Sequence, residues 1–292
     1  MKITNKLGLP VGLVRAVSTE KHNAPGCISA TTLIQGVKQI ILTQRHWNEL
    51  EDDAADRIWA VFGTAVHSLL ESEGENDFTE IEMKYKINGI MITGRIDNYN
   101  LAEGLVCDYK TSSVYKIKSQ DFEDWYLQGM IYAWLLIKNN LPVKRCRFIA
   151  MLKDYSHTEA QRNGTYPQKP VYLYEFDITQ DGLEQIEKFI YEKIDLYRKS
   201  TTVSDDAISP CSEHERWVRK PVYAVKRTGR KTAVKLCNSK DEAEFLAQQL
   251  GNNHFVEYRP GESIRCRSYC LCSQFCNFYN EVLRNQASDN AA

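Results

Sequence analysis

The chain has 292 residues, of which 43% are hydrophobic and 26% charged; this suits one large or two small folded domains and excludes both a disulfide-stapled miniprotein and a disordered chain. No apolar run reaches the roughly 18 residues of a membrane span, and no secretory signal is visible at the N-terminus, so we expect a cytoplasmic protein without a membrane partner. The formal net charge is −1, so nucleic-acid binding would need a local basic surface.

The first part of the chain predicts two helices followed by three strands. Ser29 to Thr32 offers caps for a helix whose apolar stripe runs to Ile41, and the apolar face of 58–70, a helix that carries His67, should be buried. Asn88-Gly89 is a hairpin signal. The three strands are expected at 79–87, 90–98 and 105–111.

The next elements complete an α/β core. They are a buried helix (122–137), a strand (143–152), a long loop (155–170), a strand (171–177) and a helix (about 179–199). The order of helix, three strands, helix and strand is typical of an α/β or α+β core that begins with an antiparallel meander.

A small ββαβ unit is predicted near the C-terminus. Its strands are expected at 222–226, 231–236 and 254–258, and its helix at 239–250. Cys211 precedes the unit and Cys266 follows it. We therefore expect a core at 1–210, a ββαβ insertion at 211–259, and a cysteine-rich segment and tail at 260–292 that packs on the core.

Acidic and basic residues on two expected strands predict a metal site. Side chains alternate along a strand, so Asp108 and Lys110 should share one face. Asp97 on the neighbouring strand adds a second carboxylate, and His67 could supply a nitrogen, which together suit Mg²⁺ or Mn²⁺. Such an ion would activate a water and neutralise charge on a phosphate, with Lys110 positioning the water and stabilising charge.

The order of these motifs resembles the PD-(D/E)XK nucleases. The motifs are Gly63-x3-His67, Gly94-x2-Asp97, Asp108-x-Lys110 and Gln128-x3-Tyr132. The resemblance covers about residues 31–278 and is closest to the RecB-type branch, with its CRISPR-associated four-cysteine exonucleases and related phage exonucleases. It implies a restriction-endonuclease-like αβββαβ core, here with a ββαβ insertion and a C-terminal cysteine cluster, and makes 1–210 the nuclease core.

The same resemblance implies roles for individual residues. His67, Asp97, Asp108 and the Tyr109 carbonyl would bind the metal, and Lys110 would be the catalytic lysine. Gln128 and Tyr132, which share a helix face, would contact DNA or orient that lysine. A further acidic residue of the family is left open between two candidates, Glu71 and Glu82.

Some side chains near the expected strands could contact DNA. The basic residues could follow the phosphate backbone and the aromatic residues could stack on unpaired bases, although a core position is the stronger expectation for Trp125. These candidates are Arg95, Lys116, Lys118, Arg147, Tyr115 and Trp125.

Four of the nine cysteines lie close together near the C-terminus. Cys266, Cys270 and Cys276 would supply three ligands of a four-thiolate site, which fits either Zn²⁺ or a [4Fe–4S] cluster; the resemblance favours the iron–sulphur cluster. For the fourth ligand we favour Cys211, with Cys27 and Cys272 as alternatives. The other cysteines should be buried apolar residues: Cys107, Cys146 and Cys237.

The resemblance thus implies a metal-dependent DNA exonuclease that hydrolyses phosphodiester bonds at linear, in some cases single-stranded, DNA ends. It would act in phage recombination, replication or repair, with recombination or replication proteins as partners. If the gene belongs to a phage, the protein would be located in the host cytoplasm. The alternatives are a DNA-binding protein that does not cut, and an assembly protein stapled by zinc.

Overall fold

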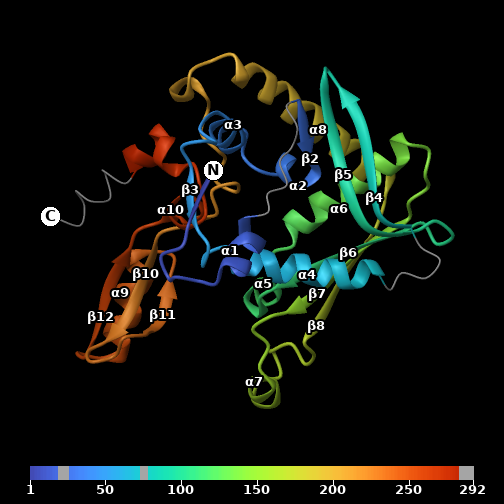
Figure 1. The fold of residues 1–292 in the computed structure, drawn as a ribbon. Coiled ribbons are helices and arrows are strands. Elements are labelled where there is room, and N and C mark those ends of the chain that lie inside the picture. The colour runs from blue at the N-terminus through green and yellow to red at the C-terminus, as the bar shows by residue number, and fades with distance from the viewer. Residues whose placement is uncertain (19–25, 73–77, 283–292) are drawn as a thin grey trace. The chain divides into compact units, whose positions relative to one another are not determined.

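The computed structural model describes residues 1–18, 26–72 and 78–282, without the side chains of 71 and 72. The chain divides into two compact units, Met1–Ser204 and Asp205–Ala292, and each is described by itself (Figure 1). Among the helices described, none is long and apolar enough to span a membrane.

Unit 1 is a mixed α/β unit. In chain order its elements are β1 (Lys2–Thr4), α1 (Val11–Ser18), β2 (Cys27–Ser29), α2 (Ala30–Leu33), α3 (Val37–Arg45), β3 (Glu51–Asp53), α4 (Ile58–Ser72), β4 (Phe78–Ile87), β5 (Ile90–Asn100), β6 (Leu105–Ser112), α5 (Val114–Ser119), α6 (Glu123–Lys138), β7 (Arg145–Leu152), α7 (His157–Arg162), β8 (Val171–Asp177) and α8 (Gln180–Thr201). The sequence α4, β4–β6, α6, β7 is the predicted αβββαβ order, so the α/β fold class is confirmed.

The main sheet of unit 1 is mixed. Its strand order is β2-β5-β6-β7-β8, and β4 pairs with the other edge of β5. The β4–β5 hairpin, which stands out as two long strands in Figure 1, turns at Asn88 and Gly89 with φ of +48° and +87°. Both central residues of this tight turn have positive φ, which the Asn-Gly pair tolerates best.

The edge of β5 that faces β6 is divided between two partners. β2 pairs in parallel with Met91–Thr93, whereas β6 pairs in antiparallel fashion with 98–100. Since β4 occupies the opposite edge, residues 94–97 lie between β2 and β6 without a neighbouring strand on that side. The sheet therefore opens beside Asp97.

Helix α6 packs on β4, β5 and β7, and α8 packs on α6. Most of α6 is buried, as its apolar composition predicts. Trp125 is part of an aromatic layer in which its ring stacks on Phe122 and Phe148, with centroids 5.2 and 5.8 Å away. Trp125 is therefore a core residue, and it does not offer a stacking surface for bases.

Three local expectations are wrong. The first predicted helix is broken into α2 and α3, because Gly36 is extended and forms the N-cap of α3. The predicted loop at 155–170 contains the short helix α7. Helix α4 forms, but no described side chain on it is fully buried and Trp59 is 54% exposed, since its small and polar positions face the cavity described below.

Unit 2 contains the ββαβ fold. Its elements are η1 (Asp205–Ala207), β9 (Val218–Arg219), β10 (Val222–Arg227), β11 (Ala233–Cys237), α9 (Lys240–Leu250), β12 (His254–Arg259), β13 (Glu262–Ser263), α10 (Ile264–Ser268) and η2 (Ser273–Phe275). The sheet order is β11-β10-β12, and α9 packs on it through Val225, Cys237, Ala243 and Ala247. Strands β9 and β13 pair where the insertion begins and ends.

Two glycines of the predicted motifs differ in how closely they are packed. A Cβ at Gly94 would lie 2.7 Å from Leu135 Cδ1 and 3.0 Å from the Tyr132 ring, whereas one at Gly63 would lie an ordinary 3.4 Å from Thr111 Oγ1. Because Leu135 and Tyr132 are buried, neither can turn away. Strand β5 can therefore approach α6 only without a side chain at Gly94.

We predict that Gly94→Ala lowers the free energy of unfolding by about 1–3 kcal/mol through overpacking. The matched change Gly63→Ala should raise it by up to about 1 kcal/mol, because alanine favours a helix interior. Thermal and urea unfolding of the full chain measure both effects. Equal losses in the two variants would contradict the packing argument.

Candidate active site

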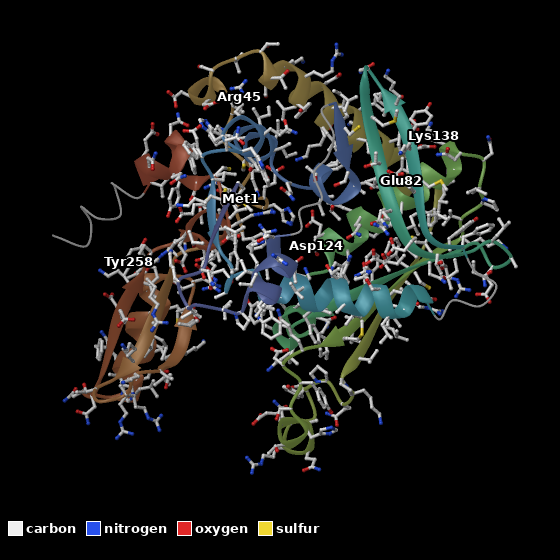
Figure 2. All side chains as sticks on the ribbon, viewed as in Figure 1. Met1, Arg45, Glu82, Asp124, Lys138 and Tyr258 are labelled. Carbon is white, nitrogen blue, oxygen red and sulfur yellow. The ribbon has the colours of Figure 1, made fainter. Side chains whose placement is uncertain are left out.

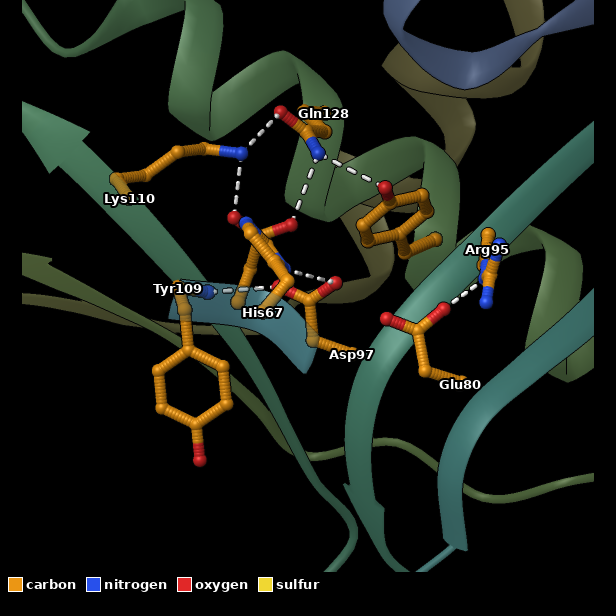
Figure 3. A network of polar contacts seen from close by, with 9 residues as sticks. His67, Glu80, Arg95, Asp97, Tyr109, Lys110 and Gln128 are labelled. Atoms are coloured by element: carbon orange, nitrogen blue, oxygen red, sulfur yellow. Dashed lines mark hydrogen bonds and ion pairs between the residues drawn. The ribbon is translucent and has the colours of Figure 1, made fainter. Parts of the chain in front are cut away.

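A cavity of about 1060 Å³ lies in unit 1 where the sheet opens beside β5. It receives side chains from α4, β4, β5, β6 and α6. Figure 3 shows the polar network inside it. The residues of this network are His67, Glu80, Arg95, Asp97, Asp108, Tyr109, Lys110, Gln128 and Tyr132.

Asp97 connects α4 with the two central strands. One of its carboxylate oxygens, Oδ1, lies 3.2 Å from His67 Nδ1. The other, Oδ2, accepts a hydrogen bond of 2.8 Å from the backbone NH of Tyr109. The Asp97 carboxylate is thus held from both sides where β5 and β6 separate.

Glu80 is a site residue that the sequence reasoning missed. Its carboxylate forms a group with His67 and Asp97 in which one ligand atom of each lies within 4.8 Å of the others. Glu80 lies opposite Asp97 in the β4–β5 pairing, between the pairs Thr79–Asn98 and Ile81–Ile96. It adopts φ of +50°, which is strained for a residue with a side chain.

Of the two acidic candidates from the sequence, the structure describes the side chain of Glu82 alone, and Glu82 is not part of this group. Glu82 is exposed on β4 and pairs with Lys84 at 2.9 Å, although it also lines the cavity. The side chain of Glu71 lies outside the described residues. Among the described acidic side chains of β4, Glu80 is the one that lies beside His67 and Asp97, and its carboxylate contacts Arg95 Nε.

Asp108, Lys110, Gln128 and Tyr132 form a second, connected group. Lys110 Nζ contacts Asp108 Oδ1 and donates to Gln128 Oε1 at 3.0 Å. Gln128 Nε2 donates to Asp108 Oδ2 at 2.9 Å and to the Tyr132 hydroxyl at 2.8 Å. The single amide of Gln128 thus holds the carboxylate and the ammonium group in fixed positions on the same face of β6.

Burial and pairing determine the protonation of the site. The hydrogen bond to Asp97 raises the pKa of His67, so a metal ion at this imidazole would have to displace a proton. Burial raises the pKa of Asp108, which is 2% exposed, against the opposing effect of Lys110. Burial also raises the pKa of Tyr132 well above its usual value, so its hydroxyl stays protonated.

The residues fit a divalent cation. Glu80 Oε2 and Asp108 Oδ1 are buried and lack hydrogen bonds of good geometry, although each lies against a basic side chain. Asp108 lies outside the tight group of His67, Glu80 and Asp97, but it is close enough that the charges of Asp97 and His67 shift its pKa. Carboxylates with one imidazole are a donor set for Mg²⁺ or Mn²⁺.

The other predicted contact residues vary in accessibility. Lys116 pairs with Asp124 at 2.6 Å, and Arg147 pairs with Glu175 at 2.5 Å, so both charges are partly neutralised. Arg95 lines the cavity. Lys118 is exposed, as is Tyr115.

In unit 2, Cys266 interacts electrostatically with Cys270 and Cys276. Burial first, and then these two thiolates, raises the pKa of Cys266. Cys270 Sγ lies 3.6 Å from Cys272 Sγ, and the hydrogen bond between them raises the pKa of Cys270. Among the described cysteines, no three sulfurs lie within 4.8 Å of one another, whereas Zn–S bonds of about 2.3 Å hold thiolates about 3.8 Å apart.

The remaining cysteines fall into two classes. Arg216 Nε donates to the Cys211 carbonyl at 3.0 Å, and the Arg216 charge also acts on Cys266, so Cys211 and Cys266 lie in one neighbourhood. Cys27 starts β2 in unit 1. The three cysteines predicted to be core residues are buried: Cys107, Cys146 and Cys237. The iron–sulphur site itself stays a prediction.

No family model matches the chain, and no curated protein is significantly similar to it. Several solved structures are similar in part. The crystal structure of SSO0001 is 22% identical over 63% of this chain and 82% of that chain (TM-score 0.44). An alkaline exonuclease (LHK-Exo) from Laribacter hongkongensis is 11% identical over 60% of this chain and 90% of that chain, with a TM-score of 0.39. A phage-related exonuclease from Haemophilus somnus 129PT is 13% identical over 57% of this chain and 74% of that chain, with a TM-score of 0.31. At these values, function has to be inferred from the site itself.

We predict that Glu80→Gln weakens Mn²⁺ binding by about tenfold or more, because it removes a charged ligand without changing the size of the side chain. Glu82→Gln is the matched control on the same strand and should leave the affinity within about twofold. Calorimetric titration of the full chain with Mn²⁺ measures both. Equal weakening in both variants would show that general negative charge, and not a ligand at Glu80, determines binding.

Proposed function

We propose that the protein is a metal-dependent deoxyribonuclease of the PD-(D/E)XK type that hydrolyses phosphodiester bonds at DNA ends. One observation carries the proposal. A single cavity holds three carboxylates from three neighbouring strands, Glu80, Asp97 and Asp108, and an ammonium group two residues after the last of them, Lys110.

The residues that would hold the cation are His67, Glu80, Asp97 and Asp108, with the Tyr109 carbonyl as a further ligand by family resemblance. A divalent cation there would supply Lewis-acid activation of a water and neutralise charge on the phosphate. Lys110 is held by Asp108 and Gln128 at the rim of this group. Its ammonium group is placed to orient the attacking water and to stabilise the charge that develops on the phosphate.

The ion pairs of the site support a role in binding anions. Each carboxylate has a basic partner: Arg95 for Glu80, His67 for Asp97 and Lys110 for Asp108. A cation that binds the carboxylates competes with these partners. Arg95 and Lys110 would then be free to contact a phosphate in the same cavity, which joins metal binding to substrate binding.

The chief alternative is a protein that binds DNA without cutting it. Burial of Asp108 argues against this alternative, because a charged carboxylate in the interior costs free energy that phosphate binding does not require. A role at the ends of linear DNA, in recombination, replication or repair, follows from the family resemblance and is part of the proposal.

We predict that Asp108→Asn and Lys110→Ala each lower cleavage of end-labelled linear DNA by about 10²–10³-fold, while DNA binding in EDTA changes little. Lys86→Ala, which removes an exposed lysine of β4, is the control and should cut normally. Parallel assays on circular DNA distinguish exonuclease from endonuclease activity. No Mg²⁺- or Mn²⁺-dependent cutting by the unaltered protein, together with DNA binding, would favour the non-cutting alternative.

We further propose that Cys211, Cys266, Cys270 and Cys276 hold a [4Fe–4S] cluster. The pairing of β9 with β13 supports Cys211, because it brings together the chain before and after the ββαβ insertion. Four thiolates fit either a [4Fe–4S] cluster or one zinc ion, and the family resemblance is what favours the cluster.

We predict that Cys211→Ser removes the visible absorbance of anaerobically purified protein and increases protease cleavage within 205–282, because metal binding and folding are coupled. Cys27→Ser and Cys272→Ser should keep the colour. Iron and zinc analysis of each variant identifies the metal. If Cys27→Ser alone removed the colour, the fourth ligand would be Cys27 and not Cys211. If the unaltered protein were colourless and contained zinc, the proposed iron–sulphur cluster would be wrong.

A further inference from the structure

The ββαβ unit carries a local excess of positive charge that the net charge of the chain conceals. Between residues 216 and 240 there are nine basic residues and no acidic one, although the whole chain has a net charge of −1. The nine are Arg216, Arg219, Lys220, Lys226, Arg227, Arg230, Lys231, Lys235 and Lys240. The unit therefore has the local basic surface that nucleic-acid binding would need.

Several of these charges are neutralised by acidic residues elsewhere in the unit. Lys226 pairs with Glu257 at 2.8 Å, Lys235 with Glu242 at 2.9 Å and Lys240 with Glu244 at 3.4 Å. By contrast, Arg227, Arg230 and Lys231 are exposed and form no ion pair with any described residue. These three lie together in the turn between β10 and β11, which we call the basic hairpin (227–231).

The basic hairpin is held in a defined conformation. Gly229 has φ of +81°, and the Arg230 NH donates to the Arg227 carbonyl at 3.0 Å. The Thr228 NH donates to the Asn253 carbonyl at 2.9 Å, which fixes the hairpin to the turn before β12. Nitrogen-bearing side chains project from this end of the unit in Figure 2. The unpaired charges are thus presented by an ordered turn.

The sheet face that adjoins the basic hairpin carries apolar side chains next to the Lys226–Glu257 ion pair. Helix α9 covers the sheet face that carries Val225 and Cys237. Because side chains alternate along a strand, Ala224, Leu236 and Phe255 lie on the other face. There Leu236 pairs with Ala224, and Phe255 pairs with Lys226. Leu236 is 53% and Phe255 45% exposed. The Phe255 ring is thus partly accessible, with Lys226 Nζ 5.9 Å from its centroid, so a base stacked on it would also lie close to the cations of this end of the sheet.

We propose that the basic hairpin and this sheet face bind a single strand of DNA, with phosphates on Arg227, Arg230 and Lys231 and a base on Phe255. Unpaired exposed cations bind a polyanion with release of counterions, and an accessible aromatic ring can stack only on bases that are not enclosed in a duplex. The inference rests on the proposed function for its choice of DNA, and it assigns to unit 2 a DNA contact separate from the cavity of unit 1.

The first test neutralises the basic hairpin with Arg227→Gln, Arg230→Gln and Lys231→Gln together. Binding of the full chain to a labelled single strand is measured by fluorescence anisotropy in EDTA at several salt concentrations. Loss of three phosphate contacts should reduce the slope of log K against log[salt] by about 2. The control neutralises three exposed residues of unit 1, Lys86→Gln, Arg162→Gln and Lys169→Gln, and should leave the slope unchanged.

The second test replaces the ring while keeping an apolar side chain. Phe255→Leu should weaken binding of a single strand by about tenfold, in line with the loss of one stacking contact, and should leave binding of a blunt duplex unchanged. Equal effects on both DNA forms, or an unchanged salt slope in the triple variant, would overturn the inference. Because EDTA prevents cutting, protein that binds as expected but never cuts would overturn only the proposed nuclease function.

Discussion

Repulsion among the three carboxylates of the cavity is the constraint on which the site depends. Glu80, Asp97 and Asp108 come from three consecutive strands, and like charges on facing strands destabilise a sheet. The protein offsets the repulsion with one basic partner for each acid: Arg95, His67 and Lys110. A divalent cation would offset it more completely, so the same repulsion would favour the metal binding that we propose.

The register of one hairpin sets this arrangement, and the sequence contained enough to find it. Asn88 and Gly89 define a two-residue turn. Counting outward from Ile87 and Ile90, seven residues along each strand, places Glu80 opposite Asp97. The turn and Asp97 are recognisable from local signals, whereas Glu80 belongs to no acidic motif and is found only when the pairing is followed across the hairpin. Alternation predicted that Asp108 and Lys110 share a face, and helical spacing predicted the same for Gln128 and Tyr132, whereas the roles of the latter pair were implied only by the family resemblance.

Other features depend on contacts that no local pattern contains. The apolar face of α4 predicted burial, yet Trp59 is largely exposed, because the helix turns its small residues and His67 toward the cavity. The break between α2 and α3 was not predictable, because Gly36 can adopt either a helical or an extended conformation and is extended here. In unit 2, the basic run was visible in the sequence, but only pairing across the sheet and α9 distinguishes the neutralised Lys226 and Lys235 from the basic hairpin.

The places where local rules fail are the places where the site is built. Glu80 has a positive φ at a cost of about 1–3 kcal/mol, Asp108 is a buried acid whose pKa is raised, and Gly94 gives up a side chain in the middle of a strand. None of these improves the packing of an ordinary sheet. Each brings a charged or polar group closer to the point where β5 and β6 separate. The local loss of stability therefore accompanies the concentration of negative charge in one cavity.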